Sequence, residues 1–162
     1  MGVVPSPRWL ADEMLGRLAR YLRFFGFDTE YVRDIEDAEI SRRAVSEGRI
    51  LLTRDRDLAR RTPGALLLRS PDLGAQLREV RRSVPGVEFA LAFDRCPECN
   101  QPLRHWDPPK TGPFPPELPL ERVVAGLAVF ECRACGRRYW DGSHAQHIRD
   151  QVRGWLTSSG GA

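Results

Sequence analysis

Two cysteine pairs with identical spacing constrain the fold of this chain more than any other feature. They are Cys96 with Cys99, followed by Asn100, and Cys132 with Cys135, followed by Gly136. A two-residue gap lets both thiolates of one turn reach a single tetrahedral ion, and Asn and Gly best tolerate the left-handed backbone that ends such a turn. The four cysteines therefore predict one structural zinc site, because four thiolates leave no open position for catalysis.

The segment around these cysteines is predicted to be a small, loop-rich zinc ribbon. Residues 102–119 hold seven of the chain's 13 prolines, and proline fits neither a helix interior nor a central strand. This insertion accounts for the long interval between the two pairs. A thioredoxin-like redox pair and plain buried thiols are the alternatives, although a redox motif needs a single pair at a strand-to-helix junction.

The part before the ribbon alternates between predicted strands and helices. Strands are predicted at 8–11, 27–32, 49–53 and 65–68, of which the first and last are apolar segments. Helices are predicted over 13–25, over 37–47, after residue 57 and after a cap at Ser70. This order is typical of an α/β fold with a parallel sheet flanked by helices. We expect two units, residues 1–94 and residues 95–162, the second closed by a helix from Ser143 to Leu156.

Length and composition exclude several classes of protein. A chain of 162 residues with 41% hydrophobic and 29% charged residues has the composition of one folded domain plus a small module. Its longest apolar run, 123–130, is far shorter than the ~18 residues that span a bilayer, and the first residues carry no secretion pattern. We therefore expect a cytoplasmic protein that has no membrane partner.

Arginine dominates the cations of this chain. It supplies 24 of the 25 cationic residues, yet the net charge is only +3. Because arginine binds phosphate oxygens bidentately, the composition permits a nucleic-acid partner. A coding bias toward GC-rich codons gives the same count, so composition alone does not demonstrate such a partner.

Four acidic residues fall where a parallel sheet places its active site, just beyond the carboxyl ends of its strands. Asp12 follows the first predicted strand, Asp55 and Asp57 follow the third, and Asp37 begins the helix between them. Hard ions such as Mg²⁺ take several oxygen ligands of this kind. A metal held there can promote phosphodiester hydrolysis.

Each of these acids also has a purely structural explanation. Asp37 and Asp57 are suited to cap helices, Asp55 is suited to form a turn, and Asp12 can pair with an arginine of the following helix. Judged alone, each explanation is at least as good as a catalytic role. Together, however, the acids lie at three strand–helix junctions on the same expected edge of the sheet, and this combination favours a catalytic site.

Several sequence runs match one known family in combination. They are LADEMLGRLARYLRFFGFD at 10–28, DAEI at 37–40, RILLTRDRDL at 49–58, YWDGSH at 139–144 and the two cysteine pairs. Together they resemble the Mut-seven C-terminal ribonuclease domain family, a branch of the PIN-like nucleases, from about Arg8 to Ile148. The resemblance implies a PIN-like domain with a parallel sheet, followed by a C-terminal zinc ribbon.

The resemblance also implies a metal-dependent ribonuclease whose partner is RNA. The implied ligands of a catalytic Mg²⁺ or Mn²⁺ are Asp12, Asp37, Asp55 and Asp57. Glu36 and Glu39 compete with Asp37 for the second position. A ribosome or a tRNA is a further possible partner.

Arginines near the acids and on the ribbon are expected to bind RNA phosphates. This predicted set is Arg17, Arg20, Arg54, Arg56, Arg137 and Arg138. Arg23 lies on the same polar side of the first helix as Arg17. Trp106 and Trp140 are candidates for base stacking, with packing in a mini-core as the alternative. His144 and His147 share one face of the closing helix. They are candidates for contact with phosphate, with ordinary surface residues as the alternative.

Two functions of other kinds stay open at this point. The first is a non-catalytic adaptor that binds RNA or the ribosome through its ribbon. The second is the toxin of a toxin–antitoxin pair, because PIN-like toxins share the acids, although such toxins usually lack a ribbon.

Overall fold

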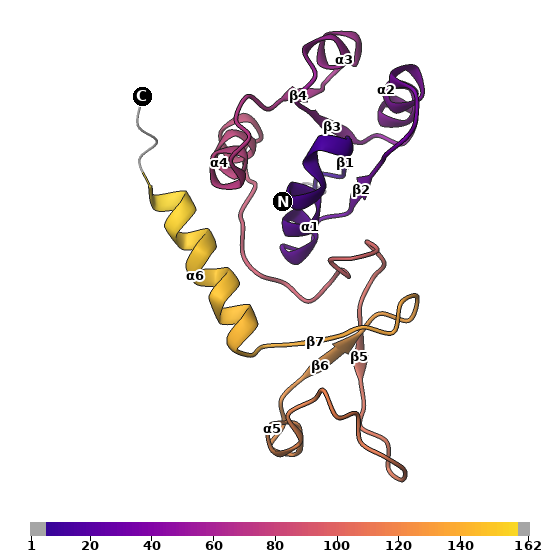
Figure 1. The fold of residues 1–162 in the computed structure, drawn as a ribbon, viewed down its shortest axis with the longest axis vertical. Coiled ribbons are helices and arrows are strands. Elements are labelled where there is room, and N and C mark those ends of the chain that lie inside the picture. Colours follow the sequence, from indigo (N-terminus) through magenta and orange to yellow (C-terminus); the bar gives the residue numbers. More distant parts are fainter. Residues whose placement is uncertain (1–5, 159–162) are drawn as a thin grey trace, which may run out of the picture.

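The computed structural model describes residues 6–158, which form two β-sheets with surrounding helices (Figure 1). The first sheet contains β1 (Trp9–Ala11), β2 (Thr29–Tyr31), β3 (Ile50–Thr53) and β4 (Leu66–Leu67). All its strands are parallel, in the order β2-β1-β3-β4. Its helices are the short 3-10 helix η1 (Glu13–Leu15), α1 (Gly16–Phe24), α2 (Asp37–Ser46), α3 (Arg56–Arg61) and α4 (Leu73–Ser83).

Apolar residues on both faces of this sheet bury it between helices. Trp9 packs with buried residues of α1 and α4, whereas Leu10 and Leu51 pack with those of α2 and α3. Successive residues of a strand point to opposite faces, so a strand that is apolar at every position is covered on both sides. The predicted α/β fold with a parallel sheet flanked by helices is confirmed.

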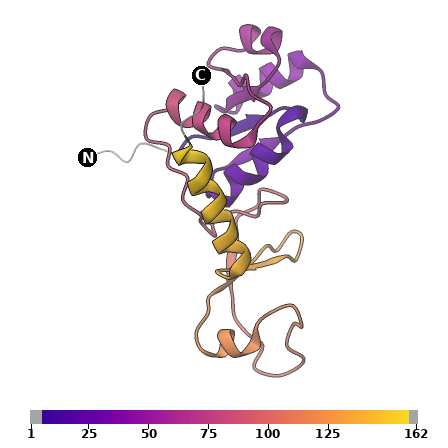
Figure 2. The same ribbon diagram turned by 60° about the vertical axis from the view of Figure 1, so that its left-hand side comes forward.

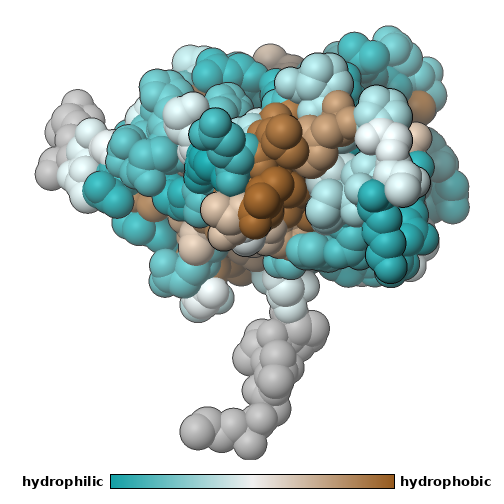
Figure 3. Space-filling view, turned by 90° about the horizontal axis from the view of Figure 1, so that it is seen from below, coloured by the Kyte–Doolittle hydropathy of each residue, from teal (hydrophilic) through white to brown (hydrophobic). Residues whose placement is uncertain are grey.

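The second sheet is antiparallel and belongs to the cysteine-containing part. It contains β5 (Arg104–Trp106), β6 (Val129–Glu131) and β7 (Arg138–Trp140). A mini-core beside it contains Leu118, Val123 and Val129, with Trp106 and Trp140 partly buried against them. The short helix α5 (Leu120–Val124) lies at the far end, and its first and last residues are exposed. Seen from below, the molecule shows a hydrophobic patch (Figure 3).

The last helix, α6 (Ser143–Thr157), leads from β7 back to the first part of the molecule (Figure 2). Its residues Ile148 and Val152 are buried in the same core as residues of α1 and α4. A Cβ atom at Gly74 of α4 would lie 2.8–2.9 Å from side-chain atoms of Trp155, so only glycine allows this approach. Neither α6 nor any other described helix is long and apolar enough to cross a membrane.

A buried arginine docks the first cysteine turn onto the parallel sheet. Arg23 is buried, not solvent-facing as its place on the polar side of α1 predicts. Its Nε donates to the Thr29 carbonyl (2.8 Å), and its Nη1 donates to the carbonyls of Pro97 (3.1 Å) and Glu98 (2.9 Å). Burial lowers the pKa of Arg23, and nearby acidic groups oppose that shift. The guanidinium therefore joins α1, β2 and the cysteine turn.

Asn100 completes this contact from the other side. Its left-handed backbone (φ 63°) ends the cysteine turn, and its side-chain Oδ1 accepts from the Thr29 backbone N–H (2.9 Å). Its Nδ2 donates to the carboxylates of Asp28 (2.8 Å) and Glu30 (3.1 Å). The residue that the zinc motif requires for its backbone thus also pairs with β2.

The cap of α4 differs from the one predicted from the sequence. Asp72 caps this helix, because its Oδ1 accepts from the Ala75 backbone N–H (2.8 Å). The Ser70 hydroxyl instead accepts from the Asp72 backbone N–H (3.1 Å). Ser70 therefore stabilises the turn before the helix. The helix begins two residues later than it would if Ser70 were its cap.

The contact between Gly74 and Trp155 gives a stability test. We expect Gly74→Ala to lower the free energy of unfolding by about 1–3 kcal/mol, because the added methyl overpacks the α4–α6 interface. Gly154→Ala is the matched control. Apart from its own turn of α6, no atom of residues 6–158 lies within 4 Å of the added methyl, and better helix propensity should raise stability by up to about 1 kcal/mol. Urea unfolding measures both, and equal effects would contradict the packing of α6 on α4.

Candidate active site and metal centre

A cleft of about 610 Å³ opens at the carboxyl-terminal edge of the parallel sheet. It lies where β1 and its neighbour β3 end, which is the edge at which such sheets bind ligands. The acidic residues that line it are Asp12, Glu13, Asp34, Glu36, Asp37 and Asp55, and the arginines are Arg33 and Arg61. Three of the four acids predicted from the sequence therefore line one cavity.

Asp12 is the most buried acid of this cleft, at 5% exposure. It follows β1 directly, and its carboxylate accepts hydrogen bonds from the Thr53 hydroxyl and the Met14 backbone N–H (3.1 Å). Burial raises the pKa of Asp12, and these hydrogen bonds oppose the rise. Within residues 6–158 Asp12 forms no ion pair, and Arg20 pairs instead with Glu98 (2.8 Å). A desolvated carboxylate without a cationic partner is suited to bind a metal ion.

Thr53, the last residue of β3, links Asp12 to Asp55. Its hydroxyl donates to the Asp12 carboxylate and accepts from the Asp55 backbone N–H (2.9 Å). Asp55 caps α3, because its Oδ1 accepts from the backbone N–H groups of Asp57 (2.7 Å) and Leu58 (2.9 Å). These backbone hydrogen bonds lower the pKa of Asp55. Oδ2 of Asp55 takes no part in the cap, which leaves it for a ligand in the cleft.

Asp37 lies across the cleft, in the first turn of α2. Its Oδ2 accepts from Nη2 of Arg61 (2.8 Å), and the N-terminal cap position of α2 belongs to Glu36, which makes no side-chain capping bond. Glu36 also lines the cleft, whereas Glu39 does not. Arg42 binds Glu39 bidentately (2.6 and 2.8 Å) on the helix surface. Of the three candidates for the second acid, the structure brings Asp37 and Glu36 to the cleft.

Asp57 lies outside the cleft lining. Its side chain is 71% exposed and pairs with Arg60 (3.0 Å) on the outer side of α3. Its backbone N–H supports the capping carboxylate of Asp55. Asp57 therefore contributes to this region through its backbone, and its carboxylate points elsewhere.

Sequence reasoning missed five residues of this site. Three of them had a signal: Thr53 ends the third strand, Asp34 lies in the loop that follows the second strand, and Glu13 adjoins Asp12. Arg33 and Arg61 had none, because their place in the cleft depends on how the loop after β2 and the end of α3 pack together. Both bring positive charge to a cavity that is otherwise acidic.

The arginines predicted to bind RNA differ in their surroundings. Arg138 is held within the ribbon, where it pairs with Glu117 (2.8 Å) and Glu131 (2.9 Å) and lies over the ring of Trp106 (5.3 Å). Arg54 is half-buried, and its Nε has no hydrogen-bond partner within the described residues. The exposed members of the set are Arg17, Arg20, Arg56 and Arg137.

The cysteines form the tightest group of metal-ligand atoms. Among residues 6–158, they are the one group of three or more His, Cys, Asp or Glu residues whose ligand atoms all lie within 4.8 Å of one another. The Sγ atoms of Cys96 and Cys135 are 3.7 Å apart, and those of Cys99 and Cys132 are 3.3 Å apart. A tetrahedral zinc with Zn–S distances of ~2.3 Å separates sulfurs by about 3.8 Å. Four cysteines in this arrangement fit a structural zinc ion.

The two cysteine turns repeat the same backbone geometry. Asn100 N donates to Cys96 O (2.9 Å), and Gly136 N donates to Cys132 O (2.7 Å). Both Asn100 and Gly136 have positive φ angles, 63° and 73°. The backbone therefore has the predicted left-handed residue after each pair.

Within residues 6–158, the carboxylates of the cleft do not form a close group of three or more like that of the cysteines. Mg²⁺ retains several waters and is usually bound by one or two carboxylates together with substrate phosphates. The buried Asp12 carboxylate and Oδ2 of Asp55, whose residues are linked through Thr53, are the oxygens that would hold such an ion. The donor set of this cleft therefore fits a hard divalent ion.

Comparison with known proteins agrees with this geometry. No curated protein and no solved structure gives a significant match to the chain. A family model, described as the Mut7-C RNAse domain, matches residues 7–152, nearly the whole chain. The description of the family indicates a ribonuclease-like function with RNA as the substrate. By this match, and in agreement with the resemblance seen in its motifs, the chain belongs to the Mut7-C RNAse domain family.

Proposed function

We propose that this protein is an Mg²⁺- or Mn²⁺-dependent ribonuclease whose active site is the cleft lined by Asp12, Asp37 and Asp55. The observation that carries the proposal is the buried Asp12 carboxylate, which has no cationic partner in the described residues and is connected by Thr53 to Asp55. A buried charge of this kind is costly unless something compensates it. A divalent ion supplies that compensation.

We propose different roles for the acidic and the basic side chains of the cleft. Asp12, which follows β1, and Asp55, which follows β3, are proposed to hold the ion, and Asp37 lines the same cleft from α2. A bound divalent ion supplies a polarised water and neutralises charge on the phosphate. Arg61 pairs with Asp37 at the same rim, and its positive charge is proposed to attract a phosphate of the RNA.

The remaining arginines extend this site toward a longer RNA. Arg17 and Arg20 lie on α1, Arg54 and Arg56 flank Asp55, and Arg137 lies on the second cysteine turn. They are proposed to contact phosphates, which position RNA without reading its sequence. Arg138 is proposed to stabilise the ribbon and not to contact RNA directly, because its guanidinium is already paired with two carboxylates.

The cysteine site is proposed to hold a structural zinc that keeps the ribbon docked on the nuclease core. Arg23 and Asn100 connect its first turn to β2, and β2 leads into the loop that carries Arg33 and Asp34 at the cleft. Zinc therefore contributes to the active site only through structure. A cytoplasmic location, where thiols stay reduced, suits such a site.

The first test is Asp12→Asn, which keeps the shape of the side chain and removes its charge. We expect RNA cleavage by the zinc-loaded protein to require added Mg²⁺ or Mn²⁺ and to fall at least about 100-fold in the variant, the scale of losing one electrostatic group in an active site. A gel assay with labelled single-stranded RNA measures the cleavage rate.

Asp57→Asn is the matched comparison, because it removes the same charge from the outer side of α3. We expect it to retain most of the cleavage. Cleavage that needs no divalent ion and survives Asp12→Asn would refute the metal mechanism. RNA binding without any cleavage by the wild type would point instead to an adaptor.

The second test is removal of zinc from the cysteine site. We expect one zinc per chain, and we expect chelation or Cys132→Ser to lower the melting temperature by at least about 5 °C, because metal binding is coupled to folding. The Thr29 amide, which donates to Asn100, should then exchange its hydrogen faster, whereas amides of the central β3 should change less. Unchanged exchange at Thr29 would contradict the proposed connection between the zinc turn and β2.

A further inference from the structure

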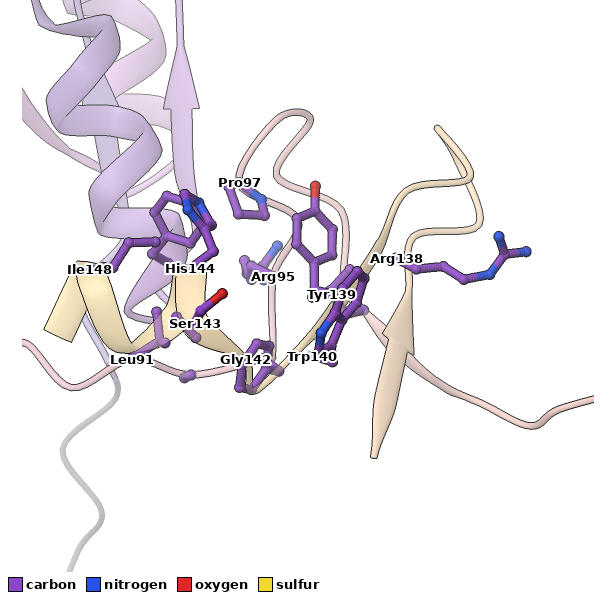
Figure 4. A pocket seen from close by; sticks show the side chains of 15 residues that line it. Leu91, Arg95, Pro97, Arg138, Tyr139, Trp140, Gly142, Ser143, His144 and Ile148 are labelled. Atoms are coloured by element: carbon purple, nitrogen blue, oxygen red, sulfur yellow. The ribbon is translucent and has the colours of Figure 1, made fainter. Parts of the chain in front are cut away.

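A second cavity, of about 260 Å³, lies where α1, the segment 91–103, β7 and α6 meet. We call it the junction pocket, and its main lining side chains are Phe24, Phe93, Tyr139, Trp140, His144 and Ile148. Figure 4 shows Tyr139 and Trp140 from the ribbon on one side, and His144 and Ile148 from α6 on the other. The pocket is therefore formed jointly by the nuclease core and the ribbon.

The surface of the junction pocket is mainly aromatic and apolar. The Tyr139 hydroxyl is 3.3 Å from the Sγ of Cys96 and so is engaged at the zinc turn. Arg138 contributes to the wall but points away from the cavity in Figure 4, toward its carboxylate partners. What remains for a ligand is a set of flat aromatic walls, with His144 at the edge.

A groove that adjoins the pocket has the opposite character. It lies between α1 and α6, has a volume of about 240 Å³, and shares Phe24, His144 and Ile148 with the junction pocket. The side chains along it that carry or can accept positive charge are Arg17, Arg20, His144 and His147. Arg20 pairs with Glu98, but both are partly exposed, and such surface pairs contribute little and yield to a stronger anion.

We propose that the junction pocket receives one unstacked base of single-stranded RNA while the adjoining groove between α1 and α6 holds the neighbouring phosphates. Aromatic side chains that take splayed bases, beside arginines that track the backbone, are the usual way of binding single strands. The positive charge of the groove is complementary to RNA phosphates, and the flat aromatic walls of the pocket are complementary to a base. This inference depends on the proposed function for its substrate and adds a subsite to it.

The size and place of the pocket agree with this occupant. Ligand pockets for drug-sized molecules measure about 300–1,000 Å³, so a cavity of about 260 Å³ suits one flat ring system and leaves sugar and phosphate outside. The helix α1 connects the two sites: η1, just before it, lines the catalytic cleft, and Phe24 at its end lines the pocket. Nine helical residues extend about 14 Å, so one strand can reach both.

The test measures RNA affinity by fluorescence anisotropy with the zinc-loaded full chain and without added Mg²⁺ or Mn²⁺. Trp140→Leu removes an aromatic wall of the pocket and keeps an apolar side chain against the mini-core. We expect it to weaken binding of a single-stranded RNA about 10-fold, with a much smaller effect on a strand of the same length that lacks its bases. Trp106→Leu is the matched control. Trp106 was the other candidate for base stacking, but it packs on the same mini-core outside the pocket, so it has no part in this subsite and its variant should leave affinity unchanged.

His144→Ala decides the question if either tryptophan variant unfolds, because His144 is exposed at the edge of the pocket. We expect it to weaken RNA binding several-fold at an unchanged melting temperature. Equal losses in both tryptophan variants, equal affinity for strands with and without bases, or an unaffected His144→Ala would each overturn the proposal. Because binding is measured without cleavage, these outcomes are independent of whether the carboxylate cleft cuts RNA.

Discussion

The parallel pairing of β1 with β3 is the constraint on which the rest of this structure depends. Both strands are buried on two faces, and their register places the end of β1 beside Leu52, where the Asp12 N–H donates to the Leu52 carbonyl (3.2 Å). The next residue of β3 is Thr53, which bridges to Asp12 and Asp55. A register change of one residue would turn every side chain to the other face, so the geometry of the carboxylates follows from the hydrophobic pairing of the strands.

The second feature that shapes the molecule is the polar docking of the cysteine turn. Arg23 donates to carbonyls of the cysteine turn, and the Asn100 side chain accepts from the Thr29 backbone N–H. Buried polar groups of this kind are costly when one partner is removed. Since α6 also returns to pack against α4, the ribbon is joined to the core at both ends. The junction pocket lies between these two attachments.

Local patterns predicted most of this architecture, and long-range contacts account for what they missed. The apolar segments at 8–11 and 49–53 predict buried strands because burial leaves a continuous run of apolar residues. The convergence of the four cysteines is also predictable from local sequence, because the two-residue gap within each pair lets both thiolates reach one ion. The burial of Arg23 was not predictable, because its partners Pro97 and Glu98 lie more than 70 residues away. The outward direction of Asp57 likewise depends on which acid caps α3.

The most direct measurement of the central claim is anomalous diffraction from crystals of the zinc-loaded protein soaked in Mn²⁺, recorded at the manganese and zinc edges. We expect a zinc peak among the four cysteine sulfurs and a manganese peak in the cleft, about 2.0–2.6 Å from carboxylate oxygens of Asp12 and Asp55. A cleft without manganese, or manganese bound only at Asp57 on the outer side of α3, would contradict it.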